Sequence, residues 1–127
     1  MAKYTSKTPA AKSVGVLFLN QPLVAKSTPV TVVYGWKINP GRGADFMALA
    51  REAAAIQAKL GASPGINVDE IGQVWYETAF DSWAAWAAYA DALAKSQEWA
   101  DFMKKAGADP AAQLMRVIRL TEYKPSM

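Results

Sequence analysis

The sequence predicts an α+β fold, with a four-stranded antiparallel sheet and two helices on one face of it. Three segments are rich in β-branched and aromatic residues, as strands are, and they lie at 29–38, 73–80 and 113–123. Two segments repeat apolar residues every three or four positions, as helices do, and they begin near Ala44 and Ser82. The two kinds of segment alternate along 127 residues, which is the usual length of one domain.

The first half of the pattern is a strand, a turn and a helix. The strand PVTVVYGWKI is followed by the turn NPGRG at 39–43 and then by a helix that ends at Gly61. One face of this helix is apolar, and it consists of Phe46, Leu49, Ala50, Ala53, Ile56 and Leu60. Residues 62–72 are rich in turn-forming residues and hold one short strand candidate around 66–68. Within this segment we expect the pair Asp69 and Glu70 to lie on the solvated surface.

The second half begins with the strand QVWYETAF at 73–80. Asp81 or Ser82 then caps a helix, because a short oxygen-bearing side chain can accept hydrogen bonds from the first turn. This helix contains the aromatic stretch DSWAAWAAYADALAKSQEWADFM, in which large side chains recur at helical spacing opposite a charged face. Such a stripe is typical of core packing rather than of a binding platform. Tyr89 lies at the edge of the stripe, so we expect its hydroxyl to reach water. Ser96 and Gln97 mark a bend or a break, and Gly107 ends the helix.

The composition excludes several kinds of site. The chain has no cysteine and no histidine, which excludes disulfides, thiolate metal sites, cysteine nucleophiles, imidazole bases and histidine-bound zinc or haem. We therefore expect no metal and no cofactor. The turn NPGRG lacks the lysine and hydroxyl of a phosphate-binding loop. There is no apolar run of 18 residues, so we expect no membrane span.

The net charge of +3 is unevenly distributed. Residues 1–29 hold four lysines and no acidic residue, which leaves 10 of the 14 basic residues and all 11 acidic residues, a net charge of −1, for the rest of the chain. A nucleic-acid-binding domain would carry basic and aromatic side chains together in its folded part. The sequence therefore predicts no nucleic-acid partner.

Residues 1–29 are predicted to form an arm, and residues 30–127 a single domain. The arm is basic and then apolar, as a signal peptide is, but its apolar run is broken by Asn20, Gln21 and Pro22. A cleavage after Ala25 would also place the large Leu23 three residues before the cut. We therefore expect a cytoplasmic protein rather than a secreted one. The apolar part of the arm is expected to dock along a sheet edge. The sheet edge of the partner subunit is favoured over that of the same subunit.

Two stretches of the chain resemble a known superfamily. In VYGWKINPGRGADFMALA (33–50) a hydrophobic strand runs into a Pro-Gly turn and a helix, and VWYETAFDSWAAWAAYADALAKSQEWADFMKKAG (74–107) joins a strand to an aromatic and alanine-rich helix. Both resemble the dimeric α/β-barrel superfamily, which includes antibiotic-biosynthesis-type monooxygenases and NIPSNAP-like proteins. The element order also fits the ferredoxin-like βαββαβ sheet of that superfamily. The resemblance covers residues 30–123 and implies a homodimer in which two sheets enclose a barrel.

The barrel-facing side of the sheet supplies the candidate site. If the more hydrophobic set of each strand packs under the helices, the other set comprises Val33, Lys37, Gln73, Trp75, Glu77, Val117 and Arg119. Polar groups on a mostly apolar face are typical of a small-molecule pocket. Trp75 is suited to stack on a planar ligand, and Lys37 or Arg119 to bind an enolate or carboxylate. Glu77 becomes a general base if desolvation raises its pKa.

A simpler interpretation of the same residues is a cross-strand ion network of Lys37, Glu77 and Arg119 at the dimer seam. Asn39 and Tyr76 are secondary site candidates, and Asn39 before Pro40 is explained most simply as a turn residue.

Two functions remain open from the sequence. The first is a homodimer or larger homo-oligomer that binds a small hydrophobic or aromatic molecule, either as a cofactor-independent oxygenase or isomerase or only as a binding protein. The second is a structural protein that assembles through residues 1–29 without chemistry. The absence of histidine departs from members of the superfamily that hold haem or use a histidine base, which argues against catalysis. The sequence identifies neither the ligand nor an enzyme activity.

Overall fold

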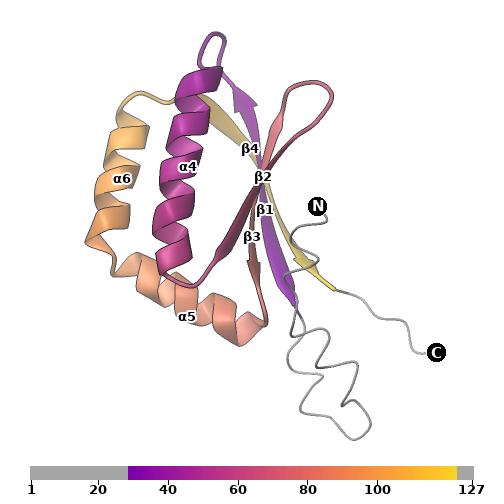
Figure 1. Ribbon diagram of the computed structural model, residues 1–127, viewed down its shortest axis with the longest axis vertical. Coiled ribbons are helices and arrows are strands. Elements are labelled where there is room, and N and C mark those ends of the chain that lie inside the picture. Colours follow the sequence, from indigo (N-terminus) through magenta and orange to yellow (C-terminus); the bar gives the residue numbers. More distant parts are fainter. Residues whose placement is uncertain (1–28, 123–127) are drawn as a thin grey trace, which may run out of the picture.

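Residues 29–122, which the computed structural model describes, form one open sheet with three helices on one of its faces (Figure 1). The strands are β1 (Val30–Ile38), β2 (Ser63–Val68), β3 (Val74–Phe80) and β4 (Ala112–Thr121). The helices are α4 (Gly43–Lys59), α5 (Trp83–Ala94) and α6 (Gln97–Ala108). The strand order is β2-β3-β1-β4, and all neighbours are antiparallel. The predicted α+β, ferredoxin-like class is therefore confirmed. The predicted arm, apart from Pro29, lies outside the described residues.

The long aromatic helix of the sequence is two helices in the structure. The Ser82 hydroxyl accepts a hydrogen bond from the Ala85 amide at 3.0 Å and begins α5. The Ser96 hydroxyl accepts one from the Trp99 amide, also at 3.0 Å, and begins α6. Each cap satisfies an amide that the first turn leaves without a helical partner. The second cap explains the break that the sequence predicted at Ser96, and α6 continues one residue beyond Gly107.

The aromatic stretch mainly packs the core, as predicted, but the order of burial differs. Tyr89 is 6% exposed and its ring lies 4.9 Å from that of Phe80, whereas Trp83 is 41% exposed. Tyr89 is therefore more buried than its place at the edge of the stripe indicated. The reason is geometric: the buried face of α5 is centred near Trp86, Tyr89 and Leu93, which follow one another at helical spacing.

The face of the sheet opposite the helices is called here the open face, and it includes Val33, Gly35 and Lys37 of β1 with Trp75 and Glu77 of β3. Trp75 lies directly over Gly35, its register partner: a Cβ atom at Gly35 would be 2.9 Å from the Trp75 ring. Glycine is required at this position because any larger side chain would displace the indole.

Strand β4 turns its more hydrophobic side toward the open face. A register shift opposite Gly35 and Trp36 pairs Arg116 with Gly35 and Ile118 with Val33. Val117 and Arg119 pair with Tyr34 and Val32 instead, and therefore lie on the helix face. The expectation that Val117 and Arg119 share a face with Trp75 was wrong. It assumed that the more hydrophobic set packs under the helices, but the helices cover this edge strand poorly, and Val117 is 43% exposed.

The close approach of Trp75 to β1 leads to a prediction for a glycine pair. Gly35→Ala should lower the free energy of unfolding by about 1–3 kcal/mol, because the added methyl group forces the indole out of its packed position. Gly107→Ala is the matched control, since a Cβ atom there meets nothing within 4 Å. It should raise stability by about 0.5–1 kcal/mol, because alanine restricts the unfolded helix segment. Urea unfolding measures both, and equal effects would contradict the packing described.

Candidate functional site

A cavity of about 380 Å³ lies between the sheet and the helices, on the face opposite the predicted site. Its walls come from β1, β3 and β4 and from all three described helices. Its size falls within the usual range of small-molecule pockets, about 300–1,000 Å³. Among the described residues that line it, none is charged. The cavity therefore suits an uncharged molecule.

The cavity exists because small residues face each other across the helix layer. Helix α4 contributes Ala50 and Ala53, and α6 contributes Ala106 and Gly107. Large rings form the walls around this space, namely Trp36, Phe46, Trp99 and Phe102. The rings of Trp99 and Phe102 are stacked with their centroids 5.2 Å apart, and those of Trp36 and Phe46 are 5.5 Å apart. These contacts between rings hold the walls in place, so the space beside the small side chains stays open.

One polar group of side chains interrupts the apolar lining. It consists of Gln57 from α4, Tyr34 from β1, Tyr76 from β3 and Tyr89 from α5, and it is called here the polar cluster. Gln57 is only 5% exposed, and its Oε1 accepts a hydrogen bond from the Tyr76 hydroxyl. The Gln57 side chain also interacts with the Tyr89 hydroxyl. Tyr34 packs edge-on against Tyr76, with the ring centroids 6.4 Å apart.

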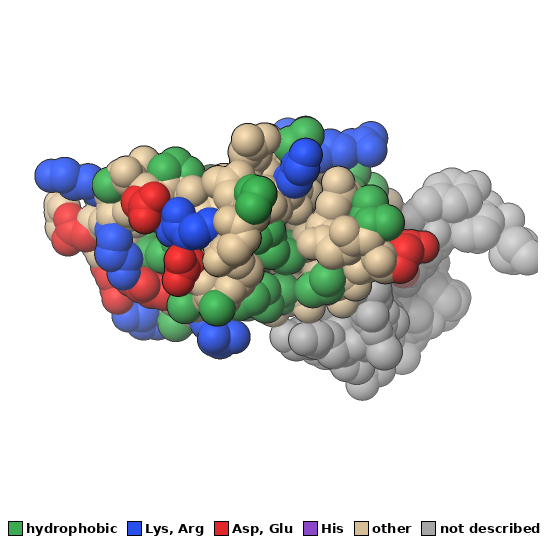
Figure 2. All heavy atoms as spheres, turned by 90° about the horizontal axis from the view of Figure 1, so that it is seen from above, with side chains coloured by type: hydrophobic (Ala, Val, Ile, Leu, Met, Phe, Trp, Pro, Cys, Tyr) green, Lys and Arg blue, Asp and Glu red, His purple; other side chains and the backbone are tan. Residues whose placement is uncertain are grey.

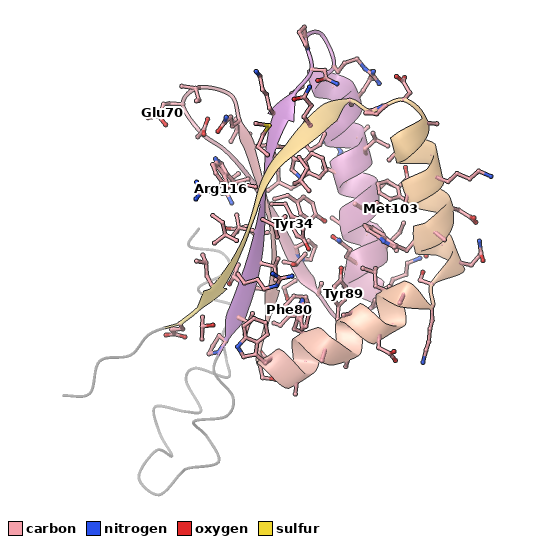
Figure 3. All side chains as sticks on the ribbon, turned by 180° about the vertical axis from the view of Figure 1, so that it is seen from behind. Tyr34, Glu70, Phe80, Tyr89, Met103 and Arg116 are labelled. Atoms are coloured by element: carbon pink, nitrogen blue, oxygen red, sulfur yellow. The ribbon has the colours of Figure 1, made fainter. Side chains whose placement is uncertain are left out.

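Burial controls the protonation of the three tyrosines. It raises the pKa of Tyr76 far above its ordinary value of 10 and that of Tyr89 to about 12. Burial also raises the pKa of Tyr34, and the nearby Arg119 guanidinium partly opposes this increase. All three phenols are protonated near neutral pH, as ordinary tyrosines are, and their raised pKa values extend this state to more alkaline pH. Figure 3 shows Tyr34 and Tyr89 on the helix side of the sheet, whereas Arg116 lies on the other side.

Exposed side chains of α6 and of the beginning of β4 contribute to the wall of the cavity. Met103 and Leu114 line it there and are 51% and 49% exposed. The nearby loops are tied together by Arg42, which pairs with Asp109 at 3.1 Å and with Asp45 at 2.7 Å. Seen from this end of the molecule, acidic and basic side chains lie side by side over the helices (Figure 2). Exposed ion pairs contribute little stability, so they mainly fix the position of the loops.

The secondary candidate Asn39 belongs to the same connection. Its side-chain amide donates to the Pro110 carbonyl at 2.9 Å, and its backbone amide donates to the Ala111 carbonyl at 2.9 Å. Pro110 and Ala111 line the cavity, so Asn39 positions its wall without entering it. Tyr76, the other secondary candidate, does line the cavity.

The predicted site residues are only partly brought together. Val33, Lys37, Trp75 and Glu77 do share the open face. Glu77 is buried, with Asn67 Nδ2 at 3.4 Å from its Oε1. It pairs with Val33, which is four residues, or about 13 Å, along β1 from Lys37. Arg119 lies on the opposite face, 5.9 Å above the Trp86 ring. The structure therefore does not assemble the predicted ion network of Lys37, Glu77 and Arg119.

Asp69 has a structural role that the sequence analysis missed. Its carboxylate accepts hydrogen bonds from Trp75 Nε1 at 3.0 Å and from the Ile71 and Gln73 amides at 3.0 and 2.9 Å. The hydrogen bond from Trp75 is the main reason that the pKa of Asp69 is lowered. Asp69 thus organises the turn between β2 and β3, a role that the predicted position on the solvated surface did not include. Trp75 and Gln73, both predicted ligand contacts, are partners of this turn.

Gln57 is the site residue that the sequence analysis overlooked. It falls on the apolar stripe of α4, four residues after Ala53 and three before Leu60. A polar residue at a core-facing position needs a buried partner, so this placement was an available signal. The tyrosines could be assigned to the same face from strand alternation, but their meeting point depends on how the helices cross the sheet.

Residues 29–122 contain neither a candidate metal site nor a candidate membrane span. No group of three acidic side chains that could hold a metal ion is found in this part of the chain. Across the same residues, no helix combines the length and the apolarity needed to cross a bilayer.

Comparisons with solved structures identify the fold. A NIPSNAP family protein from Agrobacterium tumefaciens superposes with a TM-score of 0.63 and 23% identity, over 77% of this chain and 89% of that one. A NIPSNAP-like domain protein from Burkholderia xenovorans gives 0.59 and 19%, over 79% and 88%. An antibiotic biosynthesis monooxygenase-like protein from Chloroflexus aurantiacus gives 0.55 and 16%, over 78% and 97%. No protein-family model and no curated protein matches the sequence. The resemblance predicted from the sequence is thus confirmed for the fold.

The buried tyrosines predict alkaline destabilisation. A phenol whose pKa is higher in the folded chain than in the unfolded chain stabilises the fold fully below about pH 10, and this contribution is lost as the pH rises through the folded value. The urea concentration at which half of the protein is unfolded should therefore decrease as the pH is raised from 9 to 11. Absorbance at 295 nm should show phenols of the folded protein that stay protonated at pH 11, and Tyr89→Phe should remove one of them. Ionisation of all five tyrosines near pH 10 with the fold intact would refute this.

Proposed function

We propose that this protein binds a small, uncharged and largely apolar molecule in the cavity between its sheet and its helices. The observation that carries this proposal is the lining: aromatic and aliphatic walls surround one polar cluster, and no charged side chain is present among the described lining residues. Binding sites for small molecules commonly combine an apolar wall with a few placed polar groups. The proposed binding site therefore lies on the helix face of the sheet rather than on the open face.

The catalytic form of the proposal is a cofactor-independent oxygenase or isomerase. Support comes from the shared fold, since one structural neighbour is monooxygenase-like and another is described as a possible oxidoreductase. The cavity lining argues against an isomerase that removes a proton. Its titratable groups are phenols with raised pKa values, which are poor bases near neutral pH. Glu77 and Lys37, the predicted catalytic pair, lie on the open face. Binding is therefore better supported than catalysis.

We further propose that a second copy of the chain covers the open face, as the resemblance implies. Support comes from the edge strand β4, which places Ile118 and Leu120 on the open face, Leu120 being 48% exposed. Apolar side chains gathered along a sheet are commonly covered in solution, and a two-fold pair uses the same surface on both copies. Assembly through residues 1–29, the structural alternative, concerns a part of the chain outside the described residues.

A cavity-filling pair of variants tests the binding site. Ala106→Phe places a ring inside the cavity, whereas Ala100→Phe places the same ring on the exposed side of the same helix. With tetralin and 1-tetralone as neutral fused-ring probes, Ala106→Phe should weaken both by about tenfold or more through steric exclusion. Ala100→Phe should bind as the unsubstituted protein does. Saturation-transfer NMR and calorimetry measure the affinities. Equal affinities for the two variants would place the probes elsewhere.

A charge on the open face tests the dimer. The unsubstituted chain should sediment at twice 13.7 kDa at micromolar concentration. Ile118→Glu should sediment at 13.7 kDa with unchanged helical circular dichroism, because a carboxylate would be buried without a partner at the seam. Met103→Glu, on the helix side, is the control and should leave the dimer intact. A monomeric unsubstituted chain would overturn the proposed dimer and leave the cavity proposal standing.

A further inference from the structure

We propose that the ligand of this cavity carries a neutral hydrogen-bond acceptor, a carbonyl-type oxygen, and that the hydroxyls of Tyr34 and Tyr89 hold it. This inference rests on the proposed function, because it assumes that the cavity between sheet and helices is the binding site. It adds the chemical class of the ligand and the two residues that select it.

The first step is to follow the protons of the polar cluster. Tyr76 donates its hydroxyl proton to Gln57 Oε1, so this proton is not available to a ligand. The amide nitrogen is the donor end of the Gln57 side chain and can in turn donate to the Tyr89 oxygen. The interaction of Gln57 with Tyr89 lowers the pKa of Tyr89, whereas burial raises it by more. A group that donates a hydrogen bond to the phenol oxygen has this lowering effect. Among residues 29–122 no acceptor for the Tyr89 proton is found, and Tyr89 lines the cavity, so this proton can be donated to a ligand.

Tyr34 supplies the second donor. No hydrogen bond to its hydroxyl is found among residues 29–122, although its ring lies in the wall of the cavity. A partly buried phenol without a partner is unfavourable unless water or a ligand accepts its proton. Both phenols are protonated at neutral pH, which lies well below even the ordinary pKa of 10. Tyr34 packs against the buried cluster that contains Tyr89, and both residues line the same cavity, so the two side chains lie close to each other.

Two neighbouring phenol donors select the ligand by chemistry, since no charged side chain is among the described residues that line the cavity, and Arg119, which influences Tyr34, is not one of those residues. A carboxylate would lose its hydration in a cavity whose described lining offers no cation. A pure hydrocarbon would leave both phenol protons without an acceptor. A neutral carbonyl oxygen has two lone pairs and can accept from both hydroxyls while the rest of the molecule packs against the aromatic walls.

The experiment compares 1-tetralone with tetralin, which have the same ring system with and without a carbonyl oxygen. The unsubstituted protein should bind 1-tetralone roughly 5- to 100-fold more tightly, as two hydrogen bonds of ordinary net strength allow. Tyr34→Phe and Tyr89→Phe should each reduce this preference roughly 2- to 10-fold and change tetralin binding little. Tyr76→Phe is the matched variant: it should weaken the two probes alike and keep their ratio, because its proton already goes to Gln57.

Infrared spectroscopy supplies a readout that does not depend on the stability of any variant. The carbonyl stretch of 1-tetralone bound to the unsubstituted protein should lie below its frequency in a hydrocarbon solvent, because two phenols polarise the bond. An unshifted stretch, equal affinities for the two probes, or a preference that survives both tyrosine substitutions would overturn the inference while the cavity keeps its proposed function. If neither probe binds, or if Ala106→Phe does not affect them, the proposed function fails and the inference fails with it.

Discussion

A single buried amide, the side chain of Gln57, joins the helix layer to the sheet, and the cavity depends on it. Leaving such a group without a partner would cost about 1–3 kcal/mol, so the fold must bring hydrogen-bonding groups to it. Tyr76 from β3 donates to its oxygen, and Tyr89 from α5 interacts with it as well. These partners set how close α4 and α5 stand to the sheet. Because Ala50 and Ala53 are too small to fill the space that remains, a cavity lies beside the amide.

The two faces of the sheet have divided roles. The helix face encloses the cavity, whereas the open face is packed locally by Trp75, which covers Gly35 and is held by Asp69. Trp75 was expected to stack on a ligand, but its ring and its indole N–H already have partners within the chain. Ile118 and Leu120 of β4 extend the apolar surface of the open face. The open face therefore suits association with another copy, and the helix face suits a ligand.

Strand alternation and helix periodicity were sufficient to predict the element order and the sheet. They also predicted which residues of β1 and β3 face the helices. The break at Ser96 was also visible, because a hydroxyl within a helical pattern can cap a new helix. The side assignment failed for β4, where Arg119 and Val117 face the helices, since hydrophobicity alone does not show how far helices cover an edge strand. The cavity was not predictable either. Gln57 stood out on the apolar stripe of α4, but its meeting with three tyrosines depends on how helices cross the sheet.

Intermolecular nuclear Overhauser effects from bound 1-tetralone to assigned methyl groups test most directly which face of the sheet holds the ligand. The methyl groups of Ala53 and Ala106 line the cavity, whereas the side chain of Ile118 lies on the open face. The account predicts contacts from the probe to the two alanines and none to Ile118. Contacts to Ile118 without contacts to the alanines would contradict it and return the binding site to the interior of a barrel.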